Sequence, residues 1–149
     1  MTDPHDLQRF LDAQEHSYRS ALAELRRGRK TSHWMWFVFP QVEGLGRSPM
    51  AQRFAISGLG EATAYLDHPV LGARLRECAG ALLDVASDEA AAGRQADAVA
   101  VLGDVDAVKL RSSMTLFAEA GTDDEPFREV LERYFAGEPD QATLERLRA

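Results

Sequence analysis

Cysteine, histidine and long apolar runs are all scarce in this sequence, and each shortage excludes a class of protein. Cys78 is the single cysteine, so no disulfide can form within the chain, and a reducing compartment is expected. The four histidines show no His-Glu-x-x-His spacing and one cysteine cannot build a zinc knuckle, so we expect no bound metal. A dinucleotide-binding glycine fingerprint is also missing, and we expect no cofactor.

The apolar stretches are too short for a membrane protein. None approaches the roughly 20 apolar residues of a membrane-spanning helix. The first residues lack the cationic start and apolar run of a signal peptide. We therefore expect a cytoplasmic protein with no membrane partner.

Basic residues are in the minority, with 17 lysines and arginines against 24 aspartates and glutamates and a net charge of -7. Such a surface repels phosphate polymers, so we expect no extended nucleic-acid binding. The hydrophobic fraction of 45% is that of a folded protein. With 149 residues the chain fits a single domain, residues 1–149, that needs no metal or disulfide support.

Helical periodicity runs through most of the chain. Asp3 and Pro4 are typical of a helix start, and apolar residues recur at three- and four-residue steps from Leu7 to Leu25. This pattern predicts one long amphipathic helix that ends near Gly28. Ser48 and Pro49 are expected to be the cap and the first residue of a short helix that continues through 50–56. Further helical segments are expected at 61–66, 67–83, 104–117, 123–135 and 140–147, and 98–102 is a short apolar run. We predict an all-α fold, a single irregular domain of about six to eight helices, whose short central helices exclude a regular four-helix bundle.

The segment 32–41, SHWMWFVFPQ, is the most distinctive part of the sequence. Its apolar residues occupy every face, so it must be largely buried, either as a helical turn or two or as a short strand. Histidine side chains titrate near neutrality, and indole N–H groups seek partners when buried. His33, Trp34, Trp36 and Gln41 could therefore line a pocket for a planar ligand. The alternative is a strip of core in which His33 is only hydrogen-bonded.

A cationic cluster, RRGRK, precedes this segment at 26–30. Arg29 and Lys30, together with Arg47 and Arg53, could converge on a phosphate or carboxylate, which arginine binds through two parallel hydrogen bonds. The alternative is that these cations only complement the negative end of the preceding helix. The loop 44–48, GLGRS, offers backbone N–H groups to an anion, but it lacks the spacing of a Walker loop and reads equally as an ordinary turn.

Polar residues also gather at 104–115. On a helix, Asp106, Lys109 and Ser113 share one face, and Ser112 is adjacent. The two hydroxyls could bind an anion beside Lys109. A serine nucleophile with a lysine base gains no support, because lysine precedes serine here. The alternative is an ordinary polar helix surface.

Four segments together resemble a known bacterial family: GRKTSHWMWFVFPQ at 28–41, GLGRS at 44–48, HPVLG at 68–72 and KLRSSMTLF at 109–117. They are similar to the family called domain of unknown function 1810, over nearly the whole chain. The resemblance implies a small, mainly helical protein and no established activity. Some similar proteins carry the label calpastatin, but calpastatin-type inhibitors are disordered until they bind their protease, whereas this sequence predicts a dense aromatic core.

Two functional hypotheses follow. In the first, the protein binds, and could process, a small anionic ligand such as a nucleotide or phosphometabolite. The residues expected to bind it are Trp34, Trp36, Gln41, Arg29, Lys30, Arg47, Lys109, Ser112 and Ser113. If the protein is an enzyme, His33 is the candidate catalytic acid or base.

The second hypothesis is a noncatalytic protein-interaction module, with part of the aromatic segment or of the segment 127–135 exposed. The solvent exposure of the aromatic side chains distinguishes the two hypotheses. Buried tryptophans beside a polar cavity favour the ligand, whereas a flat apolar patch favours a protein partner. No heptad seam is present, so a monomer or weak homo-oligomer is expected.

Overall fold

Helices make up the regular structure of residues 3–148, which are the residues that the computed structural model describes. Ten helices form within them: α1 (Gln8–Gln14), α2 (Tyr18–Arg26), α3 (Met35–Val38), α4 (Pro49–Arg53), α5 (Leu59–Asp67), α6 (Leu71–Ala91), α7 (Ala98–Leu102), α8 (Asp104–Ala120), α9 (Phe127–Phe135) and α10 (Gln141–Arg148). The predicted all-α class is confirmed, and the predicted number of helices is close. The additional helices arise because the N-terminal helix is divided, because the aromatic segment forms a helical turn and because the apolar run 98–102 is itself helical.

The N-terminal helix starts later than predicted. The Asp3 carboxylate accepts hydrogen bonds from the backbone N–H groups of Leu7, at 2.9 Å, and Gln8, at 3.0 Å, so it does bind the free N–H groups of a helix start. That start lies further along the chain, because α1 begins at Gln8 rather than beside Pro4.

The prediction of one continuous helix up to Gly28 is wrong, because the chain bends at residues 15–17 between α1 and α2. Gln14, the last residue of α1, is buried. Its side-chain amide donates hydrogen bonds to the Phe37 carbonyl at 2.7 Å and to the Tyr65 hydroxyl at 3.2 Å. These bonds hold the end of α1 against α3 and α5, while α2 turns away to pack on α6. Apolar periodicity continues across the bend and so conceals it.

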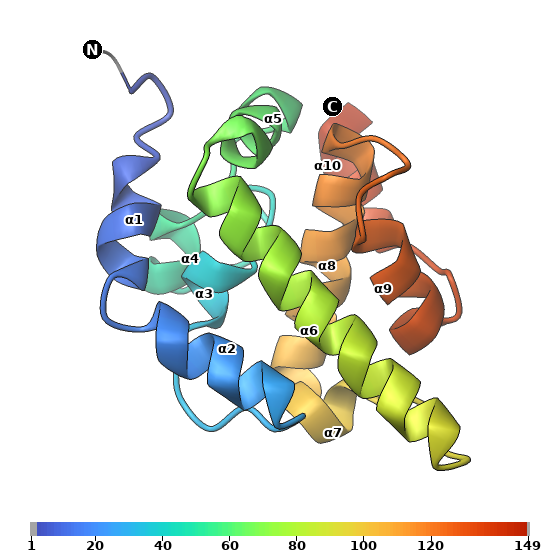
Figure 1. Cartoon of the computed structure of the whole chain (residues 1–149). Helices are drawn as coiled ribbons and strands as arrows, with labels where there is room; N and C mark the ends of the chain where they lie inside the picture. The colour runs from blue at the N-terminus through green and yellow to red at the C-terminus, as the bar shows by residue number, and fades with distance from the viewer. Residues whose placement is uncertain (1–2, 149) are drawn as a thin grey trace.

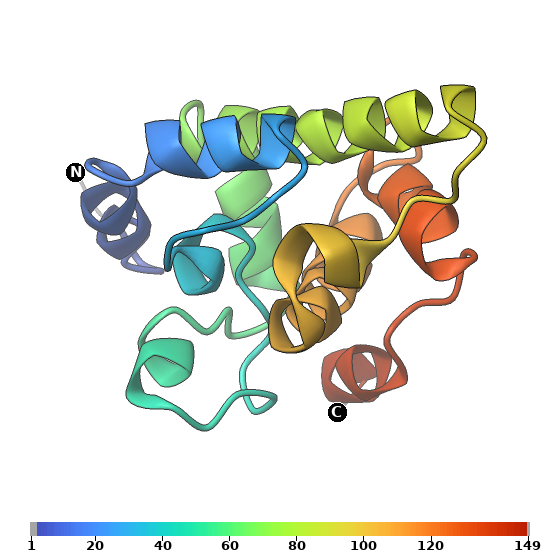
Figure 2. The same ribbon diagram turned by 90° about the horizontal axis from the view of Figure 1, so that it is seen from below.

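The longest helix, α6, has 21 residues and organises the packing. Figure 1 shows it crossing the molecule diagonally, and α2, α5 and α9 all pack against it. Seen from below, α2 and α6 lie side by side in one layer, with α7 and α8 beneath them (Figure 2). α8 joins the two halves of the chain through contacts with α5, α7, α9 and α10. None of the helices in residues 3–148 combines the length and the apolar character that crossing a bilayer requires.

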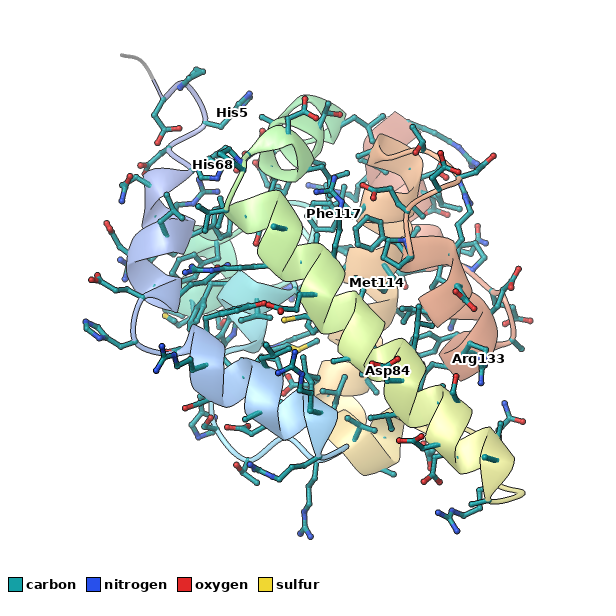
Figure 3. The ribbon with its side chains drawn as sticks, viewed as in Figure 1. His5, His68, Asp84, Met114, Phe117 and Arg133 are labelled. Carbon is teal, nitrogen blue, oxygen red and sulfur yellow. The ribbon has the colours of Figure 1, made fainter. Side chains whose placement is uncertain are left out.

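Aromatic rings connect these helices through one continuous core. The ring of Tyr65 on α5 lies 5.1 Å from that of Phe10 on α1 and 5.3 Å from that of Phe117 on α8, measured between centroids. Phe117 in turn lies 5.9 Å from Phe127 on α9. Figure 3 shows Phe117 and Met114 projecting from α8 into the interior, and both are fully buried. The helices from both ends of the sequence are thus packed on the same core.

The aromatic segment adopts the helical alternative, as the single turn α3. Trp34, Met35 and Phe37 are buried, whereas Trp36 is only half-buried. Most of the segment is therefore core, and one indole is left at the edge of the core.

A buried carboxylate fixes the entry to this segment. Glu24 on α2 is 4% exposed. Its carboxylate accepts hydrogen bonds from the N–H groups of Thr31 and Ser32, at 2.6 and 2.9 Å, from the Ser32 hydroxyl, and from Nε1 of Trp34 at 3.0 Å. Burial by itself raises the pKa of a carboxyl group, but these four hydrogen bonds outweigh it and lower the pKa of Glu24 to about 2. Glu24 is ionised at neutral pH and holds Trp34 in place.

Candidate functional site

The chain between α3 and α5 is tied into a closed loop, residues 42–56. Val42 and Ile56, both buried, form an isolated parallel bridge. The Ile56 N–H donates to the Gln41 carbonyl at 2.9 Å, and the Glu43 N–H donates to the Ile56 carbonyl at 2.7 Å. Because its neck is held by these bonds, the closed loop forms a fixed wall.

The short helix α4 lies inside the closed loop and begins as the sequence predicts. The Ser48 hydroxyl accepts a hydrogen bond from the Ala51 N–H at 3.1 Å, and Pro49 occupies the first helical position. Before Ser48 the loop faces α10, because the Glu43 carbonyl accepts a hydrogen bond from Arg146.

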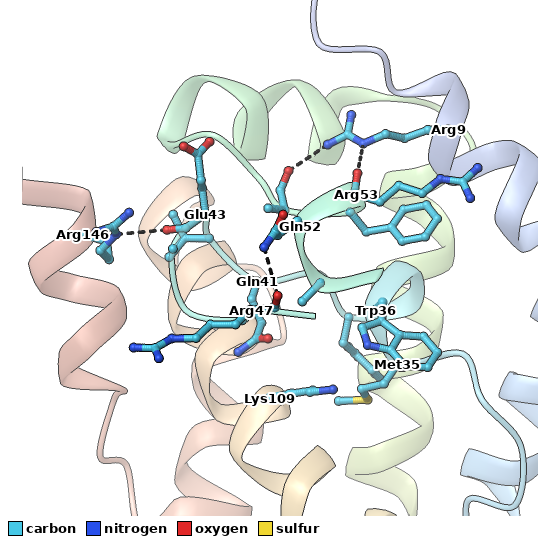
Figure 4. Close-up of a pocket in the computed structure, with 17 residues that line it drawn as sticks. Arg9, Met35, Trp36, Gln41, Glu43, Arg47, Gln52, Arg53, Lys109 and Arg146 are labelled. Atoms are coloured by element: carbon cyan, nitrogen blue, oxygen red, sulfur yellow. Dashed lines mark hydrogen bonds between the residues drawn. The ribbon is translucent and has the colours of Figure 1, made fainter. Parts of the chain in front are cut away.

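A cavity of about 530 Å³ lies between the closed loop, α3, α8 and α10 (Figure 4). We call it the basic cavity. Its lining residues are Arg9, Met35, Trp36, Phe39, Gln41, Val42, Glu43, Gly44, Gly46, Arg47, Ala51, Gln52, Arg53, Phe54, Ala55, Lys109 and Arg146. Its volume lies within the range of cavities that hold small molecules.

Cations dominate the charge of this cavity. Its charged lining residues are Arg9, Arg47, Arg53, Lys109, Arg146 and Glu43. Five positive charges and one negative charge give a formal charge of +4, in a chain whose net charge is -7. In Figure 4 the Glu43 carboxylate points away from Lys109. The sign of the local charge is therefore opposite to that of the whole protein.

Arg9 has no N–H group to spare for a ligand. Its Nε donates to the Arg53 carbonyl at 2.9 Å. One terminal nitrogen donates to the carbonyls of His5 and Asp6, and the other to the Ala55 carbonyl and the Glu61 carboxylate, at 2.6 to 2.8 Å. All five donors of the guanidinium are thus used. Arg9 is a structural clamp that joins α1 to the closed loop.

Arg146 brings the last helix to the rim of the cavity. Its Nε donates to the Glu43 carbonyl at 3.0 Å (Figure 4). A Cβ atom on Gly44 would lie 2.0 Å from a terminal nitrogen of this guanidinium, and Gly44 has a φ of +96°. Glycine at this position therefore permits both the turn and the close approach of Arg146.

Lys109 carries the charge at the floor of the cavity. Its ammonium nitrogen lies 5.2 Å from the centroid of the Trp36 ring, a cation–π contact, and 3.7 Å from the Asp106 carboxylate. Asp106 is held more closely by Lys30, at 2.9 Å. Because Lys30 is the nearer partner of Asp106, the Lys109 ammonium keeps donors available for another acceptor.

The side chains of Arg47 and Arg53 have no hydrogen-bonded or ionic partner within residues 3–148. Both are exposed, and Arg53 lies over the Phe54 ring at 5.1 Å. Guanidinium groups without partners are suited to bidentate contact with a phosphate or carboxylate. Arg47, Arg53 and Lys109 are therefore three side chains of the basic cavity whose hydrogen-bond donors are available to a ligand.

The structure brings together four of the residues singled out in the sequence. Trp36, Gln41, Arg47 and Lys109 all line the basic cavity. Sequence reasoning missed the contributions of Arg9 and Arg146, which come from opposite ends of the chain and belong to no local motif. Arg53, which the sequence groups with Arg47 as a possible contact for an anion, also lines the cavity.

The other predicted residues lie elsewhere. His33 and Arg29 are exposed and do not line the basic cavity. Trp34 is 1% exposed and is bonded to Glu24. Lys30 is paired with Asp106 and lies over the Trp34 ring at 5.1 Å. The joint site proposed for His33 with the lysines and arginines is therefore not formed at this cavity.

The two serines of α8 are also outside the cavity. Ser112 is 2% exposed and its hydroxyl donates to the Val108 carbonyl at 3.3 Å. Ser113 is fully buried, and within residues 3–148 its hydroxyl is the buried side-chain polar atom left without a partner. Both serines are buried, and neither lines the basic cavity.

Replacing Ser113 with alanine is expected to leave the free energy of unfolding unchanged or to raise it by up to about 1 kcal/mol, because an unpaired buried hydroxyl is removed. Replacing Thr115 with valine provides the contrast. The Thr115 hydroxyl donates to the Arg111 carbonyl and accepts from the Asp140 N–H, both at 2.8 Å, so its loss is expected to cost about 1–3 kcal/mol. Urea unfolding measures both, and a destabilised Ser113→Ala variant would contradict the first expectation.

Neither a metal centre nor a reactive thiol accompanies the cavity. Among residues 3–148, no group of three or more histidine, cysteine, aspartate or glutamate side chains is placed to hold a metal ion. Cys78 is buried, and burial raises the pKa of its thiol to about 12. The chemistry available at the cavity is therefore that of cationic donors, two amides and one indole.

The fold and the cavity together define a class: an all-helical protein with a basic cavity where the closed loop meets the last helix, α10. The chain belongs to the family described as Protein of unknown function (DUF1810), whose model matches residues 4–147.

A solved structure is closely similar. It is the crystal structure of the conserved hypothetical protein Rv1873 from Mycobacterium tuberculosis, with 48% sequence identity, a TM-score of 0.89 and 99% of each chain covered. A search of curated proteins finds no match.

Proposed function

We propose that this protein binds a small anionic ligand, of nucleotide or phosphometabolite type, in the basic cavity. The observation that carries the proposal is the reversal of charge, from -7 over the chain to a formal +4 at the cavity walls, or +3 when Glu61, the ion-pair partner of Arg9, is included. Cations of a soluble domain usually lie apart on its surface, where water solvates them. Arg9 is paired with Glu61, so the electrostatic repulsion is among the other four cations, Arg47, Arg53, Lys109 and Arg146, and a bound anion relieves it.

The available donors support the same proposal. Lys109 is 22% exposed and lies over the Trp36 ring, so its ammonium is partly desolvated and its attraction for an anion is less screened by water. Arg47 and Arg53 add guanidinium groups with no partner in residues 3–148. The half-buried face of Trp36 offers a surface on which a planar group can stack.

Binding of an anion is the function proposed for the basic cavity, and no reaction is assigned to it. His33 was the candidate acid or base, but its side chain lies outside the cavity. The cavity itself supplies cations that can neutralise an anion, which serves equally for binding and for stabilising a charged transition state.

The alternative of a protein-interaction module loses the surfaces on which it was based. Within 127–135, Phe127 and Val130 are fully buried, and Trp34 in the aromatic segment is 1% exposed. The tryptophan that lines the basic cavity, Trp36, is half-buried, and this supports the small-ligand hypothesis in part.

A thermal-shift screen with nucleotides, sugar phosphates, inorganic phosphate and small carboxylic acids tests the proposal. At a concentration of 100 times its Kd, a ligand stabilises the native state by about 2.7 kcal/mol, a readily measured shift of Tm. Lys109→Ala and Arg47→Ala are each expected to weaken binding by about tenfold or more, since a hydrogen bond to a charged group contributes about 1.5–3 kcal/mol.

Matched controls separate a local effect from a change in net charge. Arg94→Ala removes the same charge from an exposed position where Arg94 pairs with Glu89, so it should leave binding unchanged. His33→Ala should also leave it unchanged. A flat response of the unmodified protein to the whole panel, or an equal loss in Arg94→Ala, would refute the proposal.

A further inference from the structure

We infer that the ligand of the basic cavity is amphiphilic, with an apolar group attached to its anionic group. The inference rests on the proposed function and specifies the class of ligand. It comes from an apolar cleft next to the basic cavity, lined by Gln41, Leu45, Gly46, Asp104, Val105, Val108 and Lys109.

The two spaces adjoin each other. Gln41, Gly46 and Lys109 line both of them, so a single molecule can occupy both at once. The cleft has a volume of about 400 Å³, enough for one or two rings.

The cleft is apolar because large hydrophobic side chains, which folded proteins usually bury, line it. Val105 and Val108 are 69% and 61% exposed, the highest values among the exposed large hydrophobic side chains of residues 3–148. Three positions apart on α8, they share one face, and Leu45 of the closed loop lines the same cleft. A ligand that covers this face removes apolar surface from water, which favours binding.

The positions of the charges set the orientation of the ligand. Lys109 follows Val105 by four residues, so its side chain leaves α8 about one helical turn beyond the start of the apolar face. Asp104 is the carboxylate of the cleft, and it repels an anion placed there. The anionic group therefore enters the basic cavity and the apolar group lies along α8.

The size of the apolar face favours a small molecule over a protein partner. A stable protein interface buries at least about 1,000 Å² in total. Two valines and one leucine do not supply the core of such an interface, but they match the area of an aryl or branched alkyl group. We therefore commit to a small amphiphilic anion, such as an aryl or alkyl phosphate or carboxylate.

Calorimetric titration with inorganic phosphate, phenyl phosphate and 1-naphthyl phosphate tests the inference. We expect the naphthyl ester to bind about tenfold more tightly than inorganic phosphate, a gain that needs only about 60 Å² of buried apolar surface. In a Val105→Ser/Val108→Ser double variant, this preference should fall to about twofold or less, while the affinity for inorganic phosphate is retained. In Lys109→Ala, both affinities should fall.

Val99→Ser is the matched control, because Val99 is 48% exposed on α7 and does not line the cleft. It should keep the full preference for the naphthyl ester. Equal affinities for the three phosphates in the unmodified protein would overturn the inference and leave the proposed anion site standing. Binding of none of them would also overturn the inference, and a flat thermal-shift panel beside it would overturn the proposed function as well. A serine double variant that converts a dimer to a monomer in sedimentation would also overturn it, since the valines would then join two copies of the chain.

Discussion

Replacing Glu24 with glutamine is expected to lower the free energy of unfolding by about 3 kcal/mol at neutral pH. The pKa of Glu24 is lowered from its usual 4.5 to about 2, and this difference corresponds to about 3 kcal/mol of stabilisation of the native state. Glutamine keeps the size of the side chain but presents an NH₂ group to a site at which every partner is a donor. Urea unfolding with a fixed m-value measures the loss.

The contribution of Glu24 should also depend on pH in a defined direction. Because the native pKa is the lower one, the stabilisation is complete above about pH 4.5 and is lost as the pH falls toward 2. The difference between the unmodified protein and Glu24→Gln should therefore be less than half as large at pH 3 as at pH 7.

Glu15→Gln is the control for Glu24, because Glu15 is an exposed carboxylate at the end of α1. It should change the stability by no more than about 0.5 kcal/mol. A difference between Glu24→Gln and the unmodified protein that stays constant from pH 7 to pH 3 would show that the charge of Glu24 is not what stabilises the fold.

Replacing Gly72 with alanine is expected to destabilise the protein by about 2–3 kcal/mol, even though alanine favours helices. Gly72 lies in the first turn of α6, and a Cβ atom there would be 2.1 Å from the Leu66 carbonyl oxygen. That oxygen belongs to the backbone of α5 and also accepts a hydrogen bond from Arg76 at 3.2 Å. Relief of the overlap requires α5 and α6 to separate.

Gly80 on the same helix provides a control with the opposite sign. A Cβ atom at Gly80 would meet no heavy atom within 4 Å. Gly80→Ala should therefore stabilise the protein by about 0.5–1 kcal/mol through helix propensity alone. Chemical denaturation of the two variants compares them directly, and changes of the same sign would contradict the role assigned to Gly72.

The sequence predicts helices well where they obey local rules. Ser48 and Pro49 mark the start of α4 by cap chemistry, and the apolar stripe of α6 indicates its buried face. The sequence predicts helix boundaries poorly where contacts with residues distant in the chain determine them. The bend after Gln14 depends on bonds to Phe37 and Tyr65, and these partners are not visible in a local pattern.

In the candidate site, too, the sequence predicts what local residue types determine and misses what tertiary packing determines. Trp36, Gln41 and Lys109 could be selected from composition, because an indole, an amide and a cation stand out beside apolar residues. Trp34 was selected on the same grounds, yet its indole bonds to Glu24 in the core. The direction of each indole depends on the single turn of α3, and residue type does not encode that direction.

The basic cavity is assembled from residues between Arg9 and Arg146, almost the whole length of the sequence. A pocket whose walls come from both ends of a chain exists only once the intervening helices have packed. Its ligand would discriminate the fully folded chain from every partly folded form, so occupancy would add to the free energy of global unfolding. Resistance to proteases would then rise with the ligand concentration over the entire chain, including α6 and α9, which the ligand does not touch.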